Sequence, residues 1–242
     1  MTTTTCDIVA FAAHPDDVEL ACGGTLVLAA RQGWRTAVVD CTRGELSTRG
    51  TPEKRAQEAE AASQALGLSC RLNLGLPDGH LHDSDEARRE VVQVLRRLRP
   101  RVVLAPPAVD HHADHMAVAQ IVSRSFYLAG VEKYVPGEPP WRPHTLLHHL
   151  GSLADTPSLV VDITSTYADR VAAIECYQSQ FHKEDGSERE TRISHRNFLA
   201  AVEGTARHFG ALIGVEFGEA FNVQGPVPVQ DLVSLFAGEP WK

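Results

Sequence analysis

Short apolar runs alternate with longer segments of mixed polarity along most of this chain. The runs are short enough to be buried strands, and the mixed segments place apolar residues at helical spacing between Gly, Pro or capping residues. The pattern predicts strands at residues 9–13, 34–42, 70–74, 102–105, 145–150 and 159–163. It predicts helices at 26–32, 51–66, 85–99, 116–130 and 167–180, and mostly helical structure from there through 209.

This alternation is typical of α/β proteins, in which crossover helices join parallel strands. The length of 242 residues suits one well-packed domain. We predict a single Rossmann-like domain, residues 1–242, with three layers and a mainly parallel sheet. The Gly23-Gly24 pair at the first predicted helix lacks the Gly-x-Gly-x-x-Gly spacing, and nearby carboxylates would repel a pyrophosphate, so we expect no dinucleotide site.

Polar side chains follow directly on the first apolar run. The run 9–13 is succeeded by His14-Pro15-Asp16-Asp17, and Pro15 removes a backbone donor where the strand should stop. The carboxyl ends of parallel strands in an open α/β sheet surround the crevice where ligands bind. His14 and Asp17 are three residues apart and could face one point as nitrogen and oxygen ligands of a metal. Asp16 then remains free to handle protons.

The run 102–105 repeats this arrangement, since it is stopped by proline and followed by a polar cluster at residues 110–115. A His followed by acids also occurs in ordinary helix-capping loops, but two strand ends that together supply three imidazoles favour a metal site. Three ligands of the types His, Asp and His leave a position open for water or substrate, as in catalytic zinc sites. The same donors admit Fe²⁺, Mn²⁺ or Co²⁺, and zinc is our first choice.

Other candidate residues are less specific. Arg43, Arg49 and Arg55 lie in or just after a glycine-punctuated loop at 42–50, where they could be solvated surface charges or could contact an anionic or sugar ligand. We expect His80 and His82 to be exposed and one of the strand residues His148 and His149 to be structural.

The five cysteines, an odd number, are scattered without a Cys-x-x-Cys pair, so we expect mostly buried thiols. Cys22 and Cys41 lie near the proposed site, but neither has an adjacent His at a spacing that indicates activation. The net charge of −8 gives no electrostatic basis for binding nucleic acid or an acidic membrane surface. The start of the chain does not resemble a signal peptide, and no apolar run approaches ~20 residues. These features predict a cytoplasmic protein.

The two polar clusters match a known family. The sequences Ala13-His14-Pro15-Asp16-Asp17 and Asp110-x-His112-x-Asp114-His115 resemble those of the LmbE and PIG-L-like metal-dependent N-acetylglucosamine deacetylases. Further stretches resemble the bacillithiol-biosynthesis branch: Thr-Arg-Gly-Glu-Leu at 42–46, Leu-Pro-Asp at 76–78, Tyr-x-Ser-Gln-Phe at 177–181 and Gly-Val-Glu-Phe-Gly-Glu-Ala-Phe at 214–221. The resemblance therefore covers nearly the whole chain.

The resemblance implies a role for each matching position. It places the zinc on His14, Asp17 and His115. Asp16 would be the general base, and His112 would steady the oxyanion and protonate the leaving amine. Asp114 would orient and charge His112. Arg55 matches a family arginine that contacts substrate, and Arg43 and His111 are further substrate-binding candidates.

Three positions depart from the family pattern. Ala113 stands where a proline is common, a change that should leave the ligands in place. His111 and Phe217 stand where the bacillithiol branch would have Arg and Tyr. The last two departures concern the substrate rather than the deacetylation chemistry.

The implied reaction is hydrolysis of N-acetylglucosaminyl malate to glucosaminyl malate and acetate, by a homo-oligomer that acts on this small sugar. One alternative is deacetylation of another N-acetyl sugar, such as a chitooligosaccharide, an antibiotic precursor or a thiol conjugate. Another is a metal- or sugar-binding protein without turnover. Asp16 and His112 argue against the last alternative, because a binding module needs neither a base nor an acid.

Overall fold

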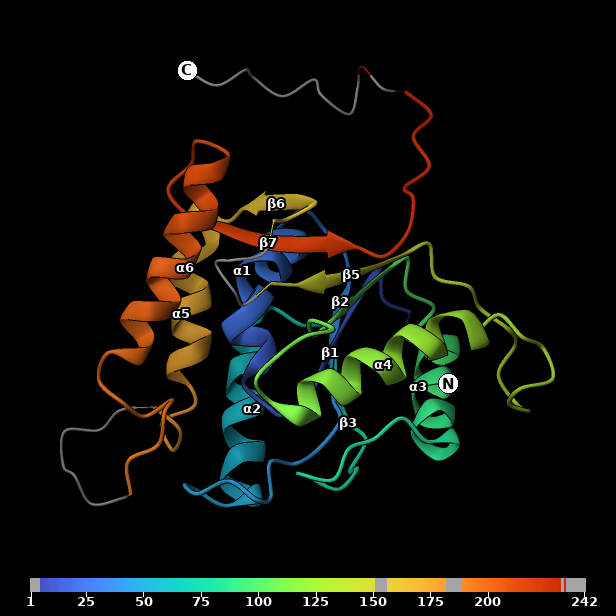
Figure 1. Ribbon diagram of the computed structural model, residues 1–242, viewed down its shortest axis with the longest axis horizontal. Helices are drawn as coiled ribbons and strands as arrows, with labels where there is room; N and C mark the ends of the chain where they lie inside the picture. Colours follow the sequence, from blue (N-terminus) through green and yellow to red (C-terminus); the bar gives the residue numbers. More distant parts are fainter. Residues whose placement is uncertain (1–4, 151–155, 182–188, 232, 234–242) are drawn as a thin grey trace.

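Seven strands form one sheet in the computed structural model, which describes residues 5–150, 156–181, 189–231 and 233 (Figure 1). The strands are β1 (Ile8–Ala12), β2 (Thr36–Asp40), β3 (Cys70–Asn73), β4 (Val102–Ala105), β5 (Thr145–His149), β6 (Leu159–Asp162) and β7 (Gly218–Val223). Their order is β3-β2-β1-β4-β5-β7-β6, and each neighbouring pair from β3 to β5 is parallel. Only β7 runs antiparallel to its neighbours, so the predicted mainly parallel α/β fold is confirmed.

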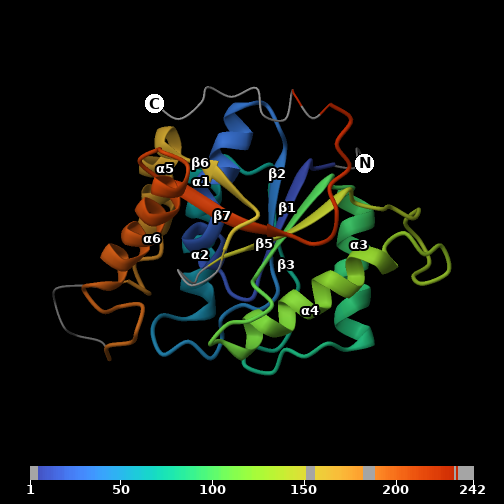
Figure 2. The same ribbon diagram turned by 45° about the horizontal axis from the view of Figure 1, so that its top comes forward.

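Helices cover both faces of the sheet. On one face lie α3 (Asp85–Leu98) and α4 (Ala113–Leu128), and on the other lie α1 (Asp17–Arg31), α2 (Pro52–Leu66), α5 (Tyr167–Glu175) and α6 (Phe198–Leu212), as Figures 1 and 2 both show. A short 3-10 turn, η1 (Thr164–Thr166), precedes α5. Val9 and Phe11 of β1 pack toward α3 and α4, whereas Ala10 and Ala12 pack toward α1. The central strand is therefore apolar on both sides, which explains its unbroken hydrophobic run.

No helix in the described part of the chain combines the length and apolar character that crossing a bilayer requires.

Two helices follow their predicted starts closely. Thr51 caps α2, where its hydroxyl accepts from the Lys54 N–H at 3.2 Å, and Ser84 caps α3 in the same way through the Ala87 N–H at 3.1 Å. Both caps precede a helix with acidic residues in its first turn, which suits the positive end of the helix dipole.

The first helix is longer than predicted, because α1 begins at Asp17 rather than at residue 26. Cys22 has non-helical dihedrals (φ −147°, ψ 20°) that kink the helix. Gly24 lies in the interior of the helix and packs closely against Ile163, since an added Cβ would lie 2.9 Å from that side chain. The N–H groups of Gly24 and Thr25, freed by the kink, donate to the Glu219 carboxylate at 2.9 and 2.7 Å. The glycines thus mark a helix interior and not a helix start.

Other boundaries also differ from the prediction. α4 begins three residues earlier than expected, and α5 ends at Glu175 instead of 180. In the stretch predicted as helical through 209, residues 189–197 form no helix and 182–188 lie outside the described residues. The strand β7 was missed, because its buried Glu219 interrupts the apolar pattern. That carboxylate is tolerated there because it receives three hydrogen bonds from Gly24 and Thr25.

Candidate active site

The loops after β1 and β4 meet at the carboxyl edge of the parallel strands. They line a cavity of about 560 Å³, which also reaches the loop after β2, the end of β5 and the inner side of α6. That volume lies in the range of sites that enclose small organic ligands. The sequence-predicted metal and catalytic residues fall in this region, as the strand pattern required.

The turn after β1 holds an unusual backbone conformation. Asp16 has φ 123° and ψ −24°, although it is not a glycine, and it is only 4% exposed. Such a conformation costs energy and persists only where the surroundings enforce it, most often at functional sites. The turn is fixed by the Asp17 carboxylate, which accepts from the His14 N–H at 2.8 Å. The side chains of the adjacent residues Asp16 and Asp17 therefore point in different directions.

His14, Asp17 and His115 come together as the sequence predicted. His14 Nδ1 lies 3.4 Å from Asp17 Oδ2, and His115 Nε2 lies 3.3 Å from Asp17 Oδ1. One ligand atom from each residue falls within 4.8 Å of the others, close enough to share an ion. Two imidazoles and one carboxylate are a donor set that suits zinc and leaves open coordination positions.

The second nitrogen of each histidine has its own carboxylate. His14 Nε2 lies 3.0 Å from Asp78 Oδ1, and His115 Nδ1 lies 3.1 Å from Asp110 Oδ2. A ring N–H donated to a carboxylate leaves the opposite nitrogen with its lone pair, which is the usual support for a metal-ligating histidine. These contacts direct His14 Nδ1 and His115 Nε2 at Asp17.

The electrostatics of this group favour a cation. Burial lowers the pKa of His14, but hydrogen bonds to Asp17 and Asp78 outweigh it and raise the pKa to about 11. Burial also lowers the pKa of His115, but the neighbouring Asp17 outweighs this effect and the pKa is raised to about 9. Burial raises the pKa of Asp17, yet the two imidazoles hold it well below its ordinary value. The carboxylates thus favour protons on both rings, and a metal ion could replace those protons.

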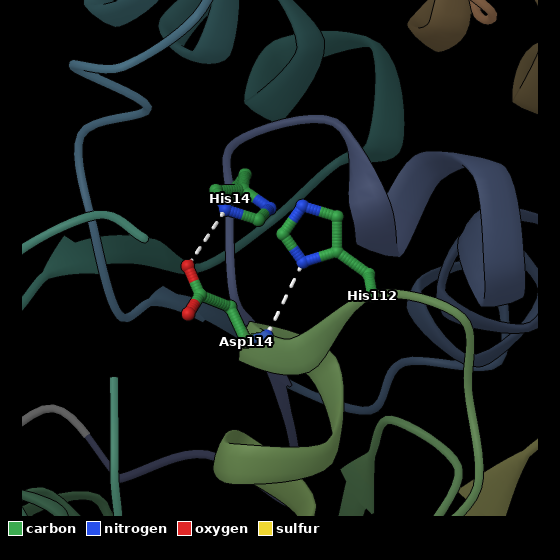
Figure 3. A group of neighbouring side chains, drawn as sticks. All are labelled: His14, His112 and Asp114. Carbon is green, nitrogen blue, oxygen red and sulfur yellow. Dashed lines mark hydrogen bonds and ion pairs between the residues drawn. The ribbon is translucent and has the colours of Figure 1, made fainter. Parts of the chain in front are cut away.

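A second group shares His14, as Figure 3 shows. His14, His112 and Asp114 also bring one ligand atom each within 4.8 Å of one another. His112 caps α4, and its Nδ1 accepts from the Asp114 N–H at 3.3 Å. The Asp114 carboxylate instead accepts from the Gly79 N–H at 2.7 Å and lies 3.5 Å from His14 Nε2. Asp114 therefore contacts the His112 ring through its backbone, whereas the expected role for its carboxylate was to charge that ring.

Arg55 lies beside the predicted base. Its Nη1 donates to Asp16 Oδ2 at 3.0 Å and to the Pro15 carbonyl, and its Nη2 donates to Ser47 Oγ at 3.0 Å. Burial raises the pKa of Asp16 to about 7, although Arg55 acts to lower it. The pKa of His112 is lowered by burial and by the neighbouring imidazoles His115 and His14. Asp16 and His112 can therefore serve as a proton acceptor and a neutral hydrogen-bond donor.

Of the predicted substrate residues, some line the cavity and others do not. Arg55 lines the cavity but is only 5% exposed and is bound to Asp16. His111 also lines the cavity, with Nδ1 at 2.7 Å from Asp110 Oδ1. Arg43 is exposed and does not form part of the cavity wall. Phe217 also lies outside the wall, where it stacks on Tyr167 with ring centroids 3.6 Å apart.

Several cavity residues were not predicted to have a role. Asp78 and Asp110 hold the two histidines, and Arg192 and α6 line the opposite side of the cavity. The Leu-Pro-Asp stretch was a signal for Asp78, but nothing in its pattern identified a partner 64 residues away. His149 is buried as expected and lines the cavity, and His80 and His82 are exposed. Cys22 and Cys41 are buried free thiols, which agrees with their expected structural role.

Comparison with known proteins places these motifs in a family context. The family model PIG-L, described as GlcNAc-PI de-N-acetylase, matches residues 9–126, which include both motif loops. The chain is 28% identical over 94% of its length to a 1D-myo-inositol 2-acetamido-2-deoxy-alpha-D-glucopyranoside deacetylase of Salinispora arenicola, 90% of which is covered.

Two other relatives complete the comparison. A 4-oxalmesaconate hydratase of Pseudomonas putida is 27% identical over 70% of this chain and 72% of its own length. The crystal structure of a conserved protein from Thermus thermophilus superposes with a TM-score of 0.83 at 38% identity. That alignment covers 94% of this chain and 98% of the other.

Proposed function

We propose, because the PIG-L family model matches residues 9–126 and a relative along most of the chain is named a deacetylase, that this chain is a hydrolytic N-deacetylase whose substrate is N-acetylglucosaminyl malate. The products would be glucosaminyl malate and acetate, as in bacillithiol biosynthesis. The observation that carries the deacetylation chemistry is the convergence of a metal-ligand set, a buried carboxylate and an imidazole on one cavity. The malate aglycone rests on the resemblance of residues 42–46, 76–78, 177–181 and 214–221 to the bacillithiol branch.

His14, Asp17 and His115 are the residues we assign to the metal, which we propose is zinc. The hydrogen bonds of the outer ring nitrogens favour this set over the one that contains His112, because His14 Nε2 is already engaged by Asp78. A bound divalent cation would lower the pKa of water and polarise the acetyl carbonyl. Asp78 and Asp110 would fix the orientation of the two imidazoles.

Asp16 is the proposed base. It lies next to the metal ligand Asp17 and lines the cavity, and Arg55 holds one of its oxygens at 3.0 Å. The second oxygen can accept the proton of the attacking water and deliver it to the departing nitrogen, a transfer that the family resemblance had assigned to His112. This role needs a carboxylate that does not itself bind the ion, which is what the turn at Asp16 provides.

His112 is the proposed donor to the acetyl oxygen. Because its Nδ1 accepts from the Asp114 N–H, the neutral ring carries its proton on Nε2. A fixed N–H stabilises the negative charge that develops on that oxygen as the amide carbon becomes tetrahedral. The lowered pKa of His112 is consistent with a neutral ring in the resting protein.

A second candidate substrate is the N-acetylglucosaminyl inositol named for the relative that aligns with 94% of this chain. It carries the same sugar on an uncharged polyol, whereas malate is a dicarboxylate. The two candidates therefore differ mainly in charge at the aglycone, and the chemistry at the acetyl group would be the same.

Acetate release tests the proposal. Purified, zinc-loaded protein would be offered N-acetylglucosaminyl malate, N-acetylglucosaminyl inositol and free N-acetylglucosamine in parallel. We expect the highest kcat/KM for the malate glycoside. A higher kcat/KM for the inositol glycoside would make that glycoside the proposed substrate in place of the malate glycoside. If none of the three released acetate, the deacetylase assignment would be refuted. The same protein would also be assayed for hydration of 4-oxalmesaconate, the reaction for which the Pseudomonas putida relative is named.

A further inference from the structure

The cavity extends beyond the metal-ligand set to a wall of different character. This far wall, residues 192–209, comprises the end of the loop before α6 and the inner side of that helix. Most of the side chains that it contributes to the cavity are apolar: Ile193, Phe198, Ala201, Val202, Ala206 and Phe209. In Figures 1 and 2, α6 lies beside α5, on the opposite face of the sheet from α4.

Three arginines line the cavity, and two of them are neutralised within the protein. Arg55 is bound to Asp16 and to a backbone carbonyl. Arg170 lies 3.3 Å from Glu219 Oε1 and donates to the carbonyl of Glu19 at 3.2 Å. Both are at most 5% exposed, so neither has a free charge to offer a ligand.

Arg192 is different. It is exposed at the far wall, and it makes no hydrogen bond or ion pair with any other residue that the structure describes. The next residue along the chain, Ile193, also lines the cavity and is apolar. A guanidinium with all of its donors available beside an apolar surface suits a carboxylate, which it can bind through two parallel hydrogen bonds.

The opposite end of the cavity offers such an anion no available arginine, because Arg55 is paired with Asp16 there. Asp16, Asp17, Asp78 and Asp110 all line that end. A carboxylate of the aglycone therefore finds an available guanidinium at the far wall, where Arg192 lies. With the acetyl group at His14, Asp17 and His115, the aglycone would extend toward the far wall.

We propose that Arg192 selects the aglycone by binding a carboxylate of the substrate against the apolar side chains of α6. This assigns the contact to Arg192 in place of Arg55, whose charge is committed to Asp16. The inference rests on the proposed function for the position of the acetyl group. It adds the residue that recognises the substrate class, an N-acetylglucosamine glycoside with a carboxylate-bearing aglycone.

Arg192→Gln tests the contact, with Arg196→Gln as a matched control. Arg196 is exposed in the same segment but does not line the cavity. Steady-state kinetics would compare N-acetylglucosaminyl malate with the uncharged methyl glycoside of N-acetylglucosamine. We expect Arg192→Gln to raise KM for the malate glycoside about 10- to 100-fold, the range for a charge-assisted hydrogen bond. The KM for the methyl glycoside should change much less, and Arg192→Lys should restore part of the loss.

Binding of free malate provides a readout without turnover. Calorimetry should detect malate binding to the wild-type protein and to Arg196→Gln, with at least about tenfold weaker binding to Arg192→Gln. The affinity for the wild-type protein should fall as salt is added, because the contact is ionic. Equal malate binding by Arg192→Gln and the wild type would overturn the inference.

The two proposals fail in distinguishable ways. Acetate release from the malate glycoside with an unchanged KM in Arg192→Gln would refute the Arg192 contact and leave the proposed function intact. Absence of acetate release from every glycoside would refute the function, whereas malate binding lost in Arg192→Gln would still support an anion subsite. If Arg55→Gln weakened malate binding more than Arg192→Gln did, the carboxylate contact would be assigned to Arg55.

Discussion

The two ends of the cavity are built on opposite principles. At the end that holds the proposed metal ligands, here called the metal end, the charged side chains are engaged with one another: His14 with Asp17 and Asp78, His115 with Asp17 and Asp110, and Asp16 with Arg55. At the α6 end the lining is mainly apolar, and Arg192 has no partner among the described residues. The side chains of the first end are held in place by one another, whereas the second end keeps an available charge for the proposed aglycone. Substitutions should accordingly affect metal content and kcat at one end and KM at the other.

The most severe test of this division removes one of the proposed metal ligands. His14→Ala, Asp17→Ala or His115→Ala should each lose most bound zinc and all measurable deacetylation, because only two protein ligands would remain. Metal content after gel filtration and acetate release are the two measurements. Chelation should abolish turnover in the wild-type protein, and added zinc should restore it.

Arg196→Gln, which alters charge away from the cavity, is the control for these three variants. A ligand variant that retained one equivalent of zinc would exclude that residue from the ligand set. Full activity after prolonged dialysis against a chelator would remove the need for a metal altogether.

Asp16 should separate chemistry from binding within the metal end. Asp16→Asn retains the shape of the side chain and an oxygen that can accept from Arg55, and asparagine occurs at positive φ more often than alanine does. It should keep its zinc and its KM but lose kcat by ~100-fold or more, the scale for loss of a general base. Single-turnover rates and metal analysis on the same preparation would measure both. A kcat near that of the wild type would mean that another group accepts the proton.

The proximity of His14, Asp17 and His115 was largely predictable from the sequence, and the reason is local. Each motif is a strand end followed by a polar loop, and parallel strands bring their carboxyl ends to the same edge. The pairing of β1 with β4 was enough to place residues near 14 beside residues near 115. The family resemblance then gave each position a role that local pattern could not supply.

The far wall could not be predicted, because it has no local signature. Residues 189–197 were expected to be helical, and their position at the cavity depends on how α6 packs against β7 and β6. The hydrogen bond between Arg55 and Asp16 was likewise not predictable from the sequence, and the expected substrate contact of Arg55 stays a prediction. Strand β7 was hidden by Glu219, whose burial makes sense only with the kink in α1.

A smaller effect is expected at Asp78, which contacts the proposed ligand His14 but is not itself a proposed ligand. Hydrogen bonding to His14, which outweighs partial burial, lowers the pKa of Asp78 to about 2, so it is a carboxylate at neutral pH. Asp78→Asn would keep an acceptor for the Leu46 N–H, now at 2.9 Å, but would lose the charge that holds His14. We expect zinc affinity to fall about 10- to 100-fold.

Competition with a chromophoric chelator would give the affinity, and kcat at saturating zinc would show whether the site recovers. Recovery of most activity at high zinc would support a positioning role. Unchanged zinc affinity in Asp78→Asn would show that His14 is held by its neighbours alone.

His149 lies at the cavity and differs from the other histidines there. Neither of its ring nitrogens has a hydrogen-bond partner among the described residues, although the side chain is only 8% exposed. Burial lowers its pKa from 6.5 to about 4. The unfolded chain therefore binds a proton near pH 6.5 that the folded protein does not bind until about pH 4. Stability consequently falls as the pH drops through that interval.

The smallest predicted effect follows from this difference in proton binding. At pH 5 the loss of stability from His149 should be about 2 kcal/mol relative to neutral pH. His149→Phe should abolish that loss, because an apolar ring of similar shape needs no partner. Urea unfolding at about pH 7.5 and about pH 5 should therefore show a smaller difference for the variant than for the wild type. Parallel losses in both proteins would mean that His149 gains a proton or a partner in the folded state.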